Sequence, residues 1–460
     1  MVLFNSIEFL FRFIPVFLVL YYVTPARFRD WTLLAGSAVF YVAGTGYLSL
    51  VLLALIPLNW LLGRAIYQSR NVRNSALHNH AFVAAVLLDA GTLVAFKILG
   101  AAGYSAYVPL GISFFIFKMI AYQADLLQQR MDEMPSLLHT ALYFSVFTQV
   151  TQGPIMRYED GNFENTRRVD LKGVTDGLFF FILGLSMKVL LADRLAILWN
   201  DLVKIGYDSL STPLAWLGAY AYSLRLYMDF WGYSLMASGL GMMIGFKFVI
   251  NFLHPYSGRG IADFYRRWHS SLGAWFRDYL YIPLGGSRGG ALKTIRNLLI
   301  VWAATGFWHG VTPNFMIWSG VLVCVIIWEK YALGKLRNSG SAFLRAVDAV
   351  LERLHVLVLI PITWVVFAVT DLSQLRLYME RMFPFFVQGR NVNPADYIKY
   401  LTMYWPFLLC SVLFCLPVTY RLLVRYRRSL PVVIAVTGLF WVCVYFILIT
   451  KSNAFMYFNF

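Results

Sequence analysis

The chain has 460 residues, of which 59% are hydrophobic, 17% are aromatic and only 13% are charged. A soluble domain is roughly 45–50% apolar and about 25% charged. The composition therefore excludes a soluble enzyme, a disordered protein and a disulfide scaffold, and it predicts an all-α protein that crosses a membrane many times. Basic residues outnumber acidic ones by 39 to 23, a net charge of +16. Because they lie in short connectors between apolar runs, we expect cytoplasmic loops against anionic lipid and no nucleic-acid partner.

The first hundred residues are predicted to hold four spanning helices, since one span needs about 20 mostly apolar residues. Val2–Val23 is interpreted as a retained first helix, because no small-residue cleavage site follows it. Trp31–Gly63 has no charged residue and is too long for one span. The sequence Gly44-Thr45-Gly46 near its middle predicts a tight turn between two helices. Ala81–Leu99 is the fourth span, with Asp89 inside it.

Two shorter segments, Pro109–Ala124 and Tyr143–Pro154, predict re-entrant or broken helices, because the second contains glutamines and ends at a proline. Further spans are expected at Gly177–Leu191, Leu214–Phe230, Tyr233–Phe248, Asn297–Phe307, Val311–Trp328, Leu354–Thr370, Tyr400–Tyr420 and Pro431–Thr450. The total is about eleven to thirteen membrane elements. We find no internal repeat and no soluble segment, so residues 1–460 are predicted to form a single membrane domain.

Residues Asn251–Arg296 interrupt this pattern, because they are too polar to cross a bilayer. From Ala262 to Leu280 the apolar residues recur at helical spacing. The other faces carry Arg266, Arg267, Arg277 and Asp278. This pattern predicts one amphipathic helix at the membrane interface or at a cytoplasmic vestibule.

His309 lies in the sequence Thr305–Gly310, inside a run from Asn297 to Trp328 that has no formally charged residue. Burying an ionisable group at membrane depth is costly unless it faces a cavity or a partner, so its presence there indicates a function. Gly306 and Gly310 could let a substrate or another part of the backbone approach closely. The alternative is a neutral imidazole hydrogen-bonded to a carbonyl in the core.

His269 is a second candidate, although a histidine on an interfacial helix is usually just solvated. It gains interest from Arg266, Arg267 and Trp268 beside it and from its place upstream of His309. The sequence has no G-x-S-x-G element, no HExxH and no Cys/His cluster. We therefore expect neither serine hydrolase chemistry nor a metal site.

Three sequence blocks carry a resemblance to a known family. Trp268–Leu272, Trp275–Gly286 and Gly306–Gly310 resemble the core of the membrane-bound O-acyltransferase (MBOAT) family, and they are most similar to its alginate O-acetylase branch. Further similar segments are residues 3–6, 152–155, 227–234, 251–256 and 455–458. Two positions depart from that branch, Leu235 and Leu253, where polar residues are expected.

The resemblance implies a ring of about 11 tilted transmembrane helices with re-entrant and interfacial helices, a central tunnel and a core motif region at residues 227–310. It implies that His309 is the catalytic histidine. His269 would be the second active-site residue, a position that is often asparagine in other branches. Trp268, Trp308, Arg266, Arg267, Arg277 and Asp278 are candidates for substrate or donor binding.

The implied function is the transfer of an acetyl group from a cytoplasmic thioester across the membrane, for O-acetylation of an extracellular polysaccharide such as alginate or another exopolysaccharide. The donor substrate would be acetyl-CoA or an acyl carrier thioester, with no bound cofactor. The implied partners are membrane lipid, an extracytoplasmic SGNH-type acetyltransferase and a polysaccharide biosynthesis complex. The implied location is the bacterial inner membrane, which the chain would cross several times.

The implied mechanism uses His309 as a general base that deprotonates the acceptor hydroxyl, or as the carrier of a transient acyl group. His269 would orient a substrate or stabilise the oxyanion. The arginines would hold the phosphates of CoA, or alternatively lipid headgroups. Other functions stay open: D-alanyl transfer to teichoic acid, a non-enzymatic membrane transporter, or a scaffold for a secreted acetyltransferase.

Overall fold

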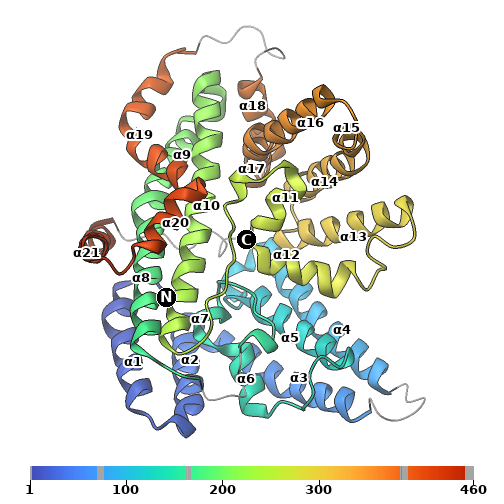
Figure 1. Ribbon diagram of the computed structural model, residues 1–460, viewed down its shortest axis with the longest axis vertical. Helices are drawn as coiled ribbons and strands as arrows, with labels where there is room; N and C mark the ends of the chain where they lie inside the picture. The colour runs from blue at the N-terminus through green and yellow to red at the C-terminus, as the bar shows by residue number, and fades with distance from the viewer. Residues whose placement is uncertain are drawn as a thin grey trace. The chain divides into compact units, whose positions relative to one another are not determined.

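The structure is a computed structural model that describes residues 3–69, 77–161, 163, 167–383, 385 and 392–450. Most of these residues are helical and none lies in a strand, which confirms the predicted all-α class (Figure 1). The α-helices are α1 (Ile14–Val23), α2 (Arg29–Thr45), α3 (Ser49–Ser69), α4 (Leu77–Leu99), α5 (Ile112–Leu127), α6 (Leu137–Ser145), α7 (Phe147–Val150), α8 (Leu171–Ser186), α9 (Asp193–Ile205), α10 (Thr212–Met243), α11 (Gly260–Arg267), α12 (Ser270–Phe276), α13 (Ala291–His309), α14 (Pro313–Trp328), α15 (Gly334–Arg337), α16 (Ala342–Leu354), α17 (Ile360–Ala368), α18 (Leu372–Met382), α19 (Asp396–Cys415), α20 (Pro417–Arg425) and α21 (Leu430–Thr450).

The chain divides into two compact units. Of the residues that the structure describes, those within 3–185, 233–250 and 440–450 belong to the first unit, and those within 186–232 and 251–439 belong to the second. In the first unit, α3, α4 and α5 pack against one another, and α2 packs against α6. In the second unit, α14 packs between α13 and α17, and α11 also contacts α14. The second unit holds every candidate site residue.

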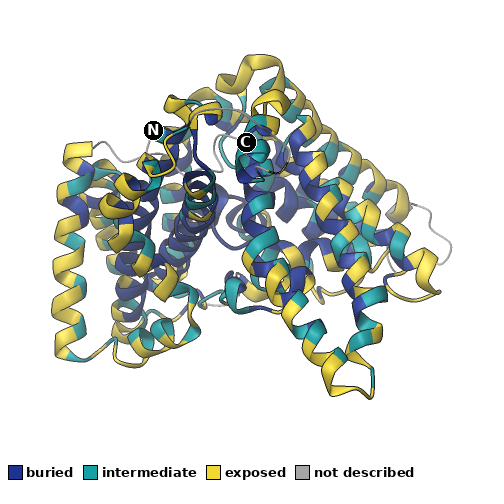
Figure 2. Cartoon of the chain, turned by 90° about the horizontal axis from the view of Figure 1, so that it is seen from above, coloured by how far each residue is buried: buried dark blue, intermediate teal, exposed yellow. Residues whose placement is uncertain are grey.

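Seven helical stretches of the described residues are long and apolar enough to cross a membrane. They are Ala26–Ser69, Asn79–Tyr107, Leu171–Ile205, Pro313–Arg337, Ala342–Ala368, Asp396–Cys415 and Leu430–Thr450, with a shorter apolar helix at Phe9–Val23. Many large apolar side chains on these helices are exposed, such as Ile434 and Leu448, which are 62% and 63% exposed (Figure 2). Contact with lipid removes the cost of hydrating them, so the chain is a multi-pass membrane protein. The ring of about 11 helices with a central tunnel stays a prediction.

The predicted turn in the long N-terminal apolar run is confirmed at Gly46. Helix α2 ends at Thr45, Gly46 has a φ of 62°, and α3 begins at Ser49. A positive φ is favourable for glycine because it has no Cβ atom. Asp89, expected inside a span, is fully buried on α4, where its Oδ1 accepts a hydrogen bond of 2.8 Å from the Asn59 amide.

Two predictions of helix boundaries were wrong. The spans expected at Leu214–Phe230 and Tyr233–Phe248 share one continuous helix, α10, because neither Trp231 nor Gly232 removes a backbone donor as proline would. The last-but-one span, expected at Tyr400–Tyr420, is divided between α19 and α20. The division falls at the residue before Pro417, where a proline disfavours the helical conformation.

The single amphipathic helix expected over Ala262–Leu280 was also wrong. The structure has two short helices, α11 and α12, separated by Trp268 and His269, and wider helical turns over Arg277–Tyr281. His269 has a φ of 46°, in the left-handed region that interrupts a right-handed helix.

Hydrogen bonds from a distant segment explain this break. The carbonyl of Arg267 accepts a bond of 3.0 Å from the N–H of Leu253, and the N–H of Ser270 donates one of 2.9 Å to the carbonyl of Asn251. In a continuous helix these groups would bond along the helix itself. Hydrogen bonds to the segment around residue 251 therefore replace the backbone hydrogen bonds of one helical turn. The local pattern of apolar residues does not reveal these bonds.

Candidate functional site

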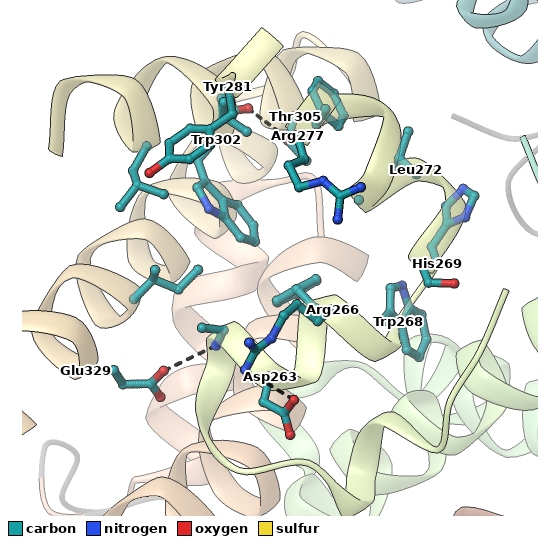
Figure 3. Close-up of a pocket in the computed structure, with 18 of the residues that line it drawn as sticks. Asp263, Arg266, Trp268, His269, Leu272, Arg277, Tyr281, Trp302, Thr305 and Glu329 are labelled. Atoms are coloured by element: carbon teal, nitrogen blue, oxygen red, sulfur yellow. Dashed lines mark hydrogen bonds and ion pairs between the residues drawn. The ribbon is translucent and has the colours of Figure 1, made fainter. Parts of the chain in front are cut away.

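The second unit encloses a cavity of about 810 Å³ that contains most of the predicted site residues (Figure 3). Its walls come from α11, α12, α13, α14 and α17. The predicted site residues that line it are Arg266, Trp268, His269, Arg277 and His309. The structure thus brings the two candidate histidines, 40 positions apart in the sequence, to one cavity.

The other three predicted residues do not line this cavity. Arg267 turns towards Asp263, with 2.9 Å between Nε and Oδ2, and lines a smaller pocket with His254 and Arg421. Trp308 packs its ring against that of His309, with 4.3 Å between centroids. Asp278 is buried and forms an ion pair of 2.7 Å with Arg277. Each of these three residues contacts a residue that lines the cavity and does not line the cavity itself.

His309 is the last residue of α13 and is buried among aromatic rings. Its ring meets Trp318 edge-on, with centroids 5.0 Å apart and an interplanar angle of 87°. Phe367 on α17 makes a second edge contact, at 4.9 Å and 84°. These rings fix the plane of the imidazole and surround it with a medium of low polarity.

The two glycines beside His309 allow a close approach by another helix. A Cβ atom on Gly306 would lie 2.4 Å from the Ser319 hydroxyl oxygen and 3.0 Å from the Phe315 carbonyl oxygen. One on Gly310 would lie 2.4 Å from the ring of Phe315. The space opened by both glycines is therefore filled by α14, which contributes Trp318 to the cavity.

A carboxamide fixes the protonation of His269. The imidazole Nδ1 lies 2.9 Å from Oδ1 of Asn251, and the same oxygen is 2.8 Å from the Ser271 hydroxyl and 3.3 Å from the Ser271 backbone nitrogen. A backbone N–H only donates, so the Asn251 atom facing it is the oxygen, which only accepts. Nδ1 of His269 therefore carries the proton, and Nε2 carries a lone pair.

The lone pair on Nε2 is available for a ligand. His269 is only 3% exposed, and no residue that the structure describes is a hydrogen-bond partner of Nε2. His269 lies outside the candidate spans, and burial lowers the pKa of its imidazole to about 3. The ring is thus neutral at physiological pH, and it presents a hydrogen-bond acceptor to a molecule in the cavity.

Four arginines and Lys330 line the cavity, and two of these arginines, Arg266 and Arg277, were predicted as site residues. The side chains of Arg266 and Arg277 are 75% and 60% exposed. Arg266 forms an ion pair with Asp263, drawn as a dashed line in Figure 3, with 3.3 Å between its Nη2 and Oδ1 of Asp263. Arg277 is paired with Asp278. Each guanidinium has five N–H groups, so donors are left for an anionic ligand.

Sequence reasoning missed three kinds of site residue. Asn251 lay in a segment noted only for its resemblance, and its role depends on contacts with residues 18 to 20 positions away. Glu329, at the end of an expected span, accepts bonds from the N–H groups of Ile261 and Ala262 at 2.7 and 3.2 Å and so caps α11. The cavity tryptophans were attributed to apolar spans; they are Trp302, Trp318 and Trp364.

A helical membrane protein with two buried histidines at one cavity has the features of a membrane-embedded transferase. The model of the family described as "MBOAT, membrane-bound O-acyltransferase family" matches residues 112–370, which is more than half of the chain and contains the whole core motif region. The chain belongs to this family, and it is an O-acyltransferase. This result favours an enzyme over a non-enzymatic transporter.

Three curated relatives show which kinds of acyltransferase the chain is similar to. The chain is 35% identical over 401 residues to "Probable alginate O-acetylase AlgI" of Pseudomonas aeruginosa, covering 83% of this chain and 75% of the relative. It is 31% identical over 373 residues to "Peptidoglycan O-acetyltransferase" of Helicobacter pylori, covering 69% and 68%. The similarity to "Teichoic acid D-alanyltransferase" of Bacillus subtilis is 29% over 245 residues, covering 48% and 60%.

Proposed function

We propose that this O-acyltransferase takes an acetyl group from a cytoplasmic thioester and passes it across the bacterial inner membrane for O-acetylation of an extracellular polysaccharide. The observation that supports it most directly is the cavity shared by His309 and His269. The names of the relatives from Pseudomonas and Helicobacter, which both refer to O-acetylation, support acetyl as the transferred group. In this proposal the whole chain acts as one domain, with residues 227–310 at its centre.

In the proposed reaction, His309 takes the proton of the acceptor hydroxyl while that oxygen forms a bond to the thioester carbonyl carbon. The carbonyl π electrons move to its oxygen, which becomes an oxyanion. The oxyanion then collapses, the C–S bond breaks, and the leaving thiolate receives the proton held by His309. General base catalysis of this kind contributes roughly 10²–10⁴-fold to the rate.

The tautomer of His269 favours one of its two expected roles. Its only ring N–H is directed to Asn251, so Nε2 has no proton to give to an oxyanion. It is able to accept a hydrogen bond from a neighbouring hydroxyl of the acceptor sugar, because the single proton of the attacking hydroxyl goes to His309. We therefore assign His269 to orienting the acceptor sugar for attack, with Asn251 holding the ring in the required tautomer.

The donor is proposed to be acetyl-CoA, whose phosphates suit the exposed guanidinium groups of Arg266 and Arg277. An Arg277→Ala variant is expected to raise the KM for acetyl-CoA several-fold with little change in kcat, because phosphate binding is equally strong before and during the reaction. The matched control is Arg376→Ala, an exposed arginine paired with Glu380. Equal KM values in the Arg277 and Arg376 variants would contradict this placement of the phosphates.

Further parts of the proposal concern partners. Membrane lipid would surround the chain. An SGNH-type acetyltransferase outside the membrane, together with a polysaccharide biosynthesis complex, would receive and use the acetyl group. Two of the three relatives described above have names that refer to acetylation, and the D-alanyltransferase is matched over a smaller share of both chains. Acetyl is therefore preferred to D-alanyl.

The test is a His309→Ala variant, with acetyl ester measured on the polysaccharide that the cells export. We expect the ester to fall by at least the 10²-fold contribution of a general base. His80→Ala, which changes an exposed histidine on α4, is the control and should keep the wild-type ester level. Wild-type ester in a stably inserted His309 variant would end the catalytic assignment.

A further inference from the structure

Trp318 is in direct ring contact with His309. It lies on α14, lines the same cavity and is 1% exposed. Its ring stands perpendicular to the imidazole at 5.0 Å, and it also stacks at 5.9 Å with Trp364. Trp364 in turn contacts Trp268, the neighbour of His269. Trp318 is therefore fixed at the side of the cavity where His309 lies.

The indole N–H of Trp318 is a buried donor without an acceptor. No residue that the structure describes accepts a hydrogen bond from its Nε1. Leaving a buried donor unsatisfied costs about 1–3 kcal/mol, and buried tryptophan N–H groups usually find a partner. The part-buried Trp60 and Trp216 do find partners, donating to the carbonyls of Pro135 at 3.0 Å and Met382 at 3.1 Å, whereas Nε1 of Trp364, which also lines the cavity, has none among the described residues.

Two residues that line the cavity thus carry unpartnered groups, a donor on Trp318 and an acceptor on His269. The reaction proposed above needs both kinds of group. It needs an acceptor that orients the acceptor sugar, which His269 supplies. It also needs a donor for the carbonyl oxygen, and His269 has no free N–H to serve as one.

We propose that the Nε1–H of Trp318 binds the thioester carbonyl oxygen and stabilises the oxyanion that forms on it. This inference rests on the proposed function. The ring that carries this donor stands 5.0 Å from the imidazole that takes the proton. The surrounding aromatic rings strengthen the bond, because a hydrogen bond to a developing charge is stronger in a medium of low polarity.

The test compares two substitutions that separate hydrogen bonding from packing. Trp318→Phe keeps an apolar ring and removes the donor, whereas Trp318→His is smaller and more polar but keeps a ring N–H. A donor role predicts that the His variant is more active than the Phe variant. A packing role predicts the reverse order. Rates are compared per folded protein, as measured by gel filtration and thermal melting in detergent.

The assay is CoA release from acetyl-CoA by the full chain in membranes that contain the cell's own polysaccharide. We expect kcat of Trp318→Phe to fall by about 10²–10³-fold, the usual effect of removing one oxyanion donor, with KM nearly unchanged. Trp216→Phe is the control, because it loses an N–H that bonds within the protein. Wild-type kcat in Trp318→Phe, a loss confined to KM, or a Phe variant more active than the His variant would each overturn the inference.

The His309→Ala variant in the same assay separates this inference from the function it rests on. If His309→Ala is inactive and Trp318→Phe has wild-type kcat, only the role of Trp318 fails. If His309→Ala releases CoA at the wild-type rate, the proposed function itself fails.

Discussion

Replacing Asn251 by aspartate should make the enzyme sensitive to acid. The aspartate has the same shape and still accepts from Nδ1 of His269 and from the hydroxyl and backbone N–H of Ser271. Those two bonds from Ser271 stabilise its ionised form. The variant therefore places a negative charge about 3 Å from the imidazole without removing an acceptor.

The size of the effect follows from that distance. At the 2.9 Å between Oδ1 and Nδ1, two unit charges in an effective dielectric constant of about 20 attract by about 6 kcal/mol, which is an upper bound. An opposite charge this close typically raises a histidine pKa by about 1–3 units. The pKa of His269, which burial lowers to about 3, should therefore rise to about 4–6.

The sign of the pH dependence is fixed, because only neutral His269 has the Nε2 lone pair. In the wild type the ring is neutral throughout the range from pH 5 to 8, so protonation of His269 causes no fall in the reaction rate in that range. In Asn251→Asp the ring gains a proton as the pH falls through about 6 to 4, and the rate falls with it.

The measurement is the rate of CoA release from acetyl-CoA between pH 4.5 and 8. Asn338→Asp adds the same charge at an exposed position in the same unit and serves as the control. If the acid limbs of wild type, Asn338→Asp and Asn251→Asp coincide, the tautomer argument and the assignment of Nε2 are refuted.

Three further predictions concern stability, each measured by thermal melting of purified protein. Gly306→Ala should lose about 1–3 kcal/mol by pushing α13 from α14, whereas Gly320→Ala, with open space around its Cβ, should not. Glu329→Gln should lose about 1–3 kcal/mol because one N–H at the start of α11 loses its acceptor, and Glu380→Gln on the surface should change little. His269→Asn should be more stable to unfolding than His269→Ala by about 1–2 kcal/mol, because asparagine tolerates the left-handed backbone conformation at this position and alanine does not. Equal melting temperatures for the two variants would contradict backbone strain at His269.

Apolar runs predicted the architecture because lipid-facing helices must be apolar along their whole length. They did not predict that α10 continues through Gly232, because a single glycine weakens a helix without ending it. The break at His269 escaped prediction for a different reason. It depends on hydrogen bonds from Asn251 and Leu253, which lie outside any local window.

The site could be predicted in part for similar reasons. Histidines are rare in this chain, so His309 and His269 could each be weighed, and the family motif placed them together before any coordinates did. Tryptophan is abundant in membrane helices, so nothing in the sequence marks Trp318 apart from the other 13. What marks it is an unpartnered N–H on a ring that both lines the cavity and stands perpendicular to His309, which is visible only in three dimensions.

The backbone break and the tautomer of His269 have a common cause in Asn251. The backbone carbonyl of Asn251 accepts a hydrogen bond from the N–H of Ser270, and this bond interrupts the helix. The side-chain oxygen of Asn251 accepts a hydrogen bond from Nδ1–H of His269, which leaves the lone pair on Nε2. A left-handed residue other than glycine is costly and persists only where its surroundings hold it. Because one residue supplies both restraints, the residue that breaks the helix also holds the imidazole in a single tautomer. The orientation of Nε2 is thus built into the fold before any substrate binds.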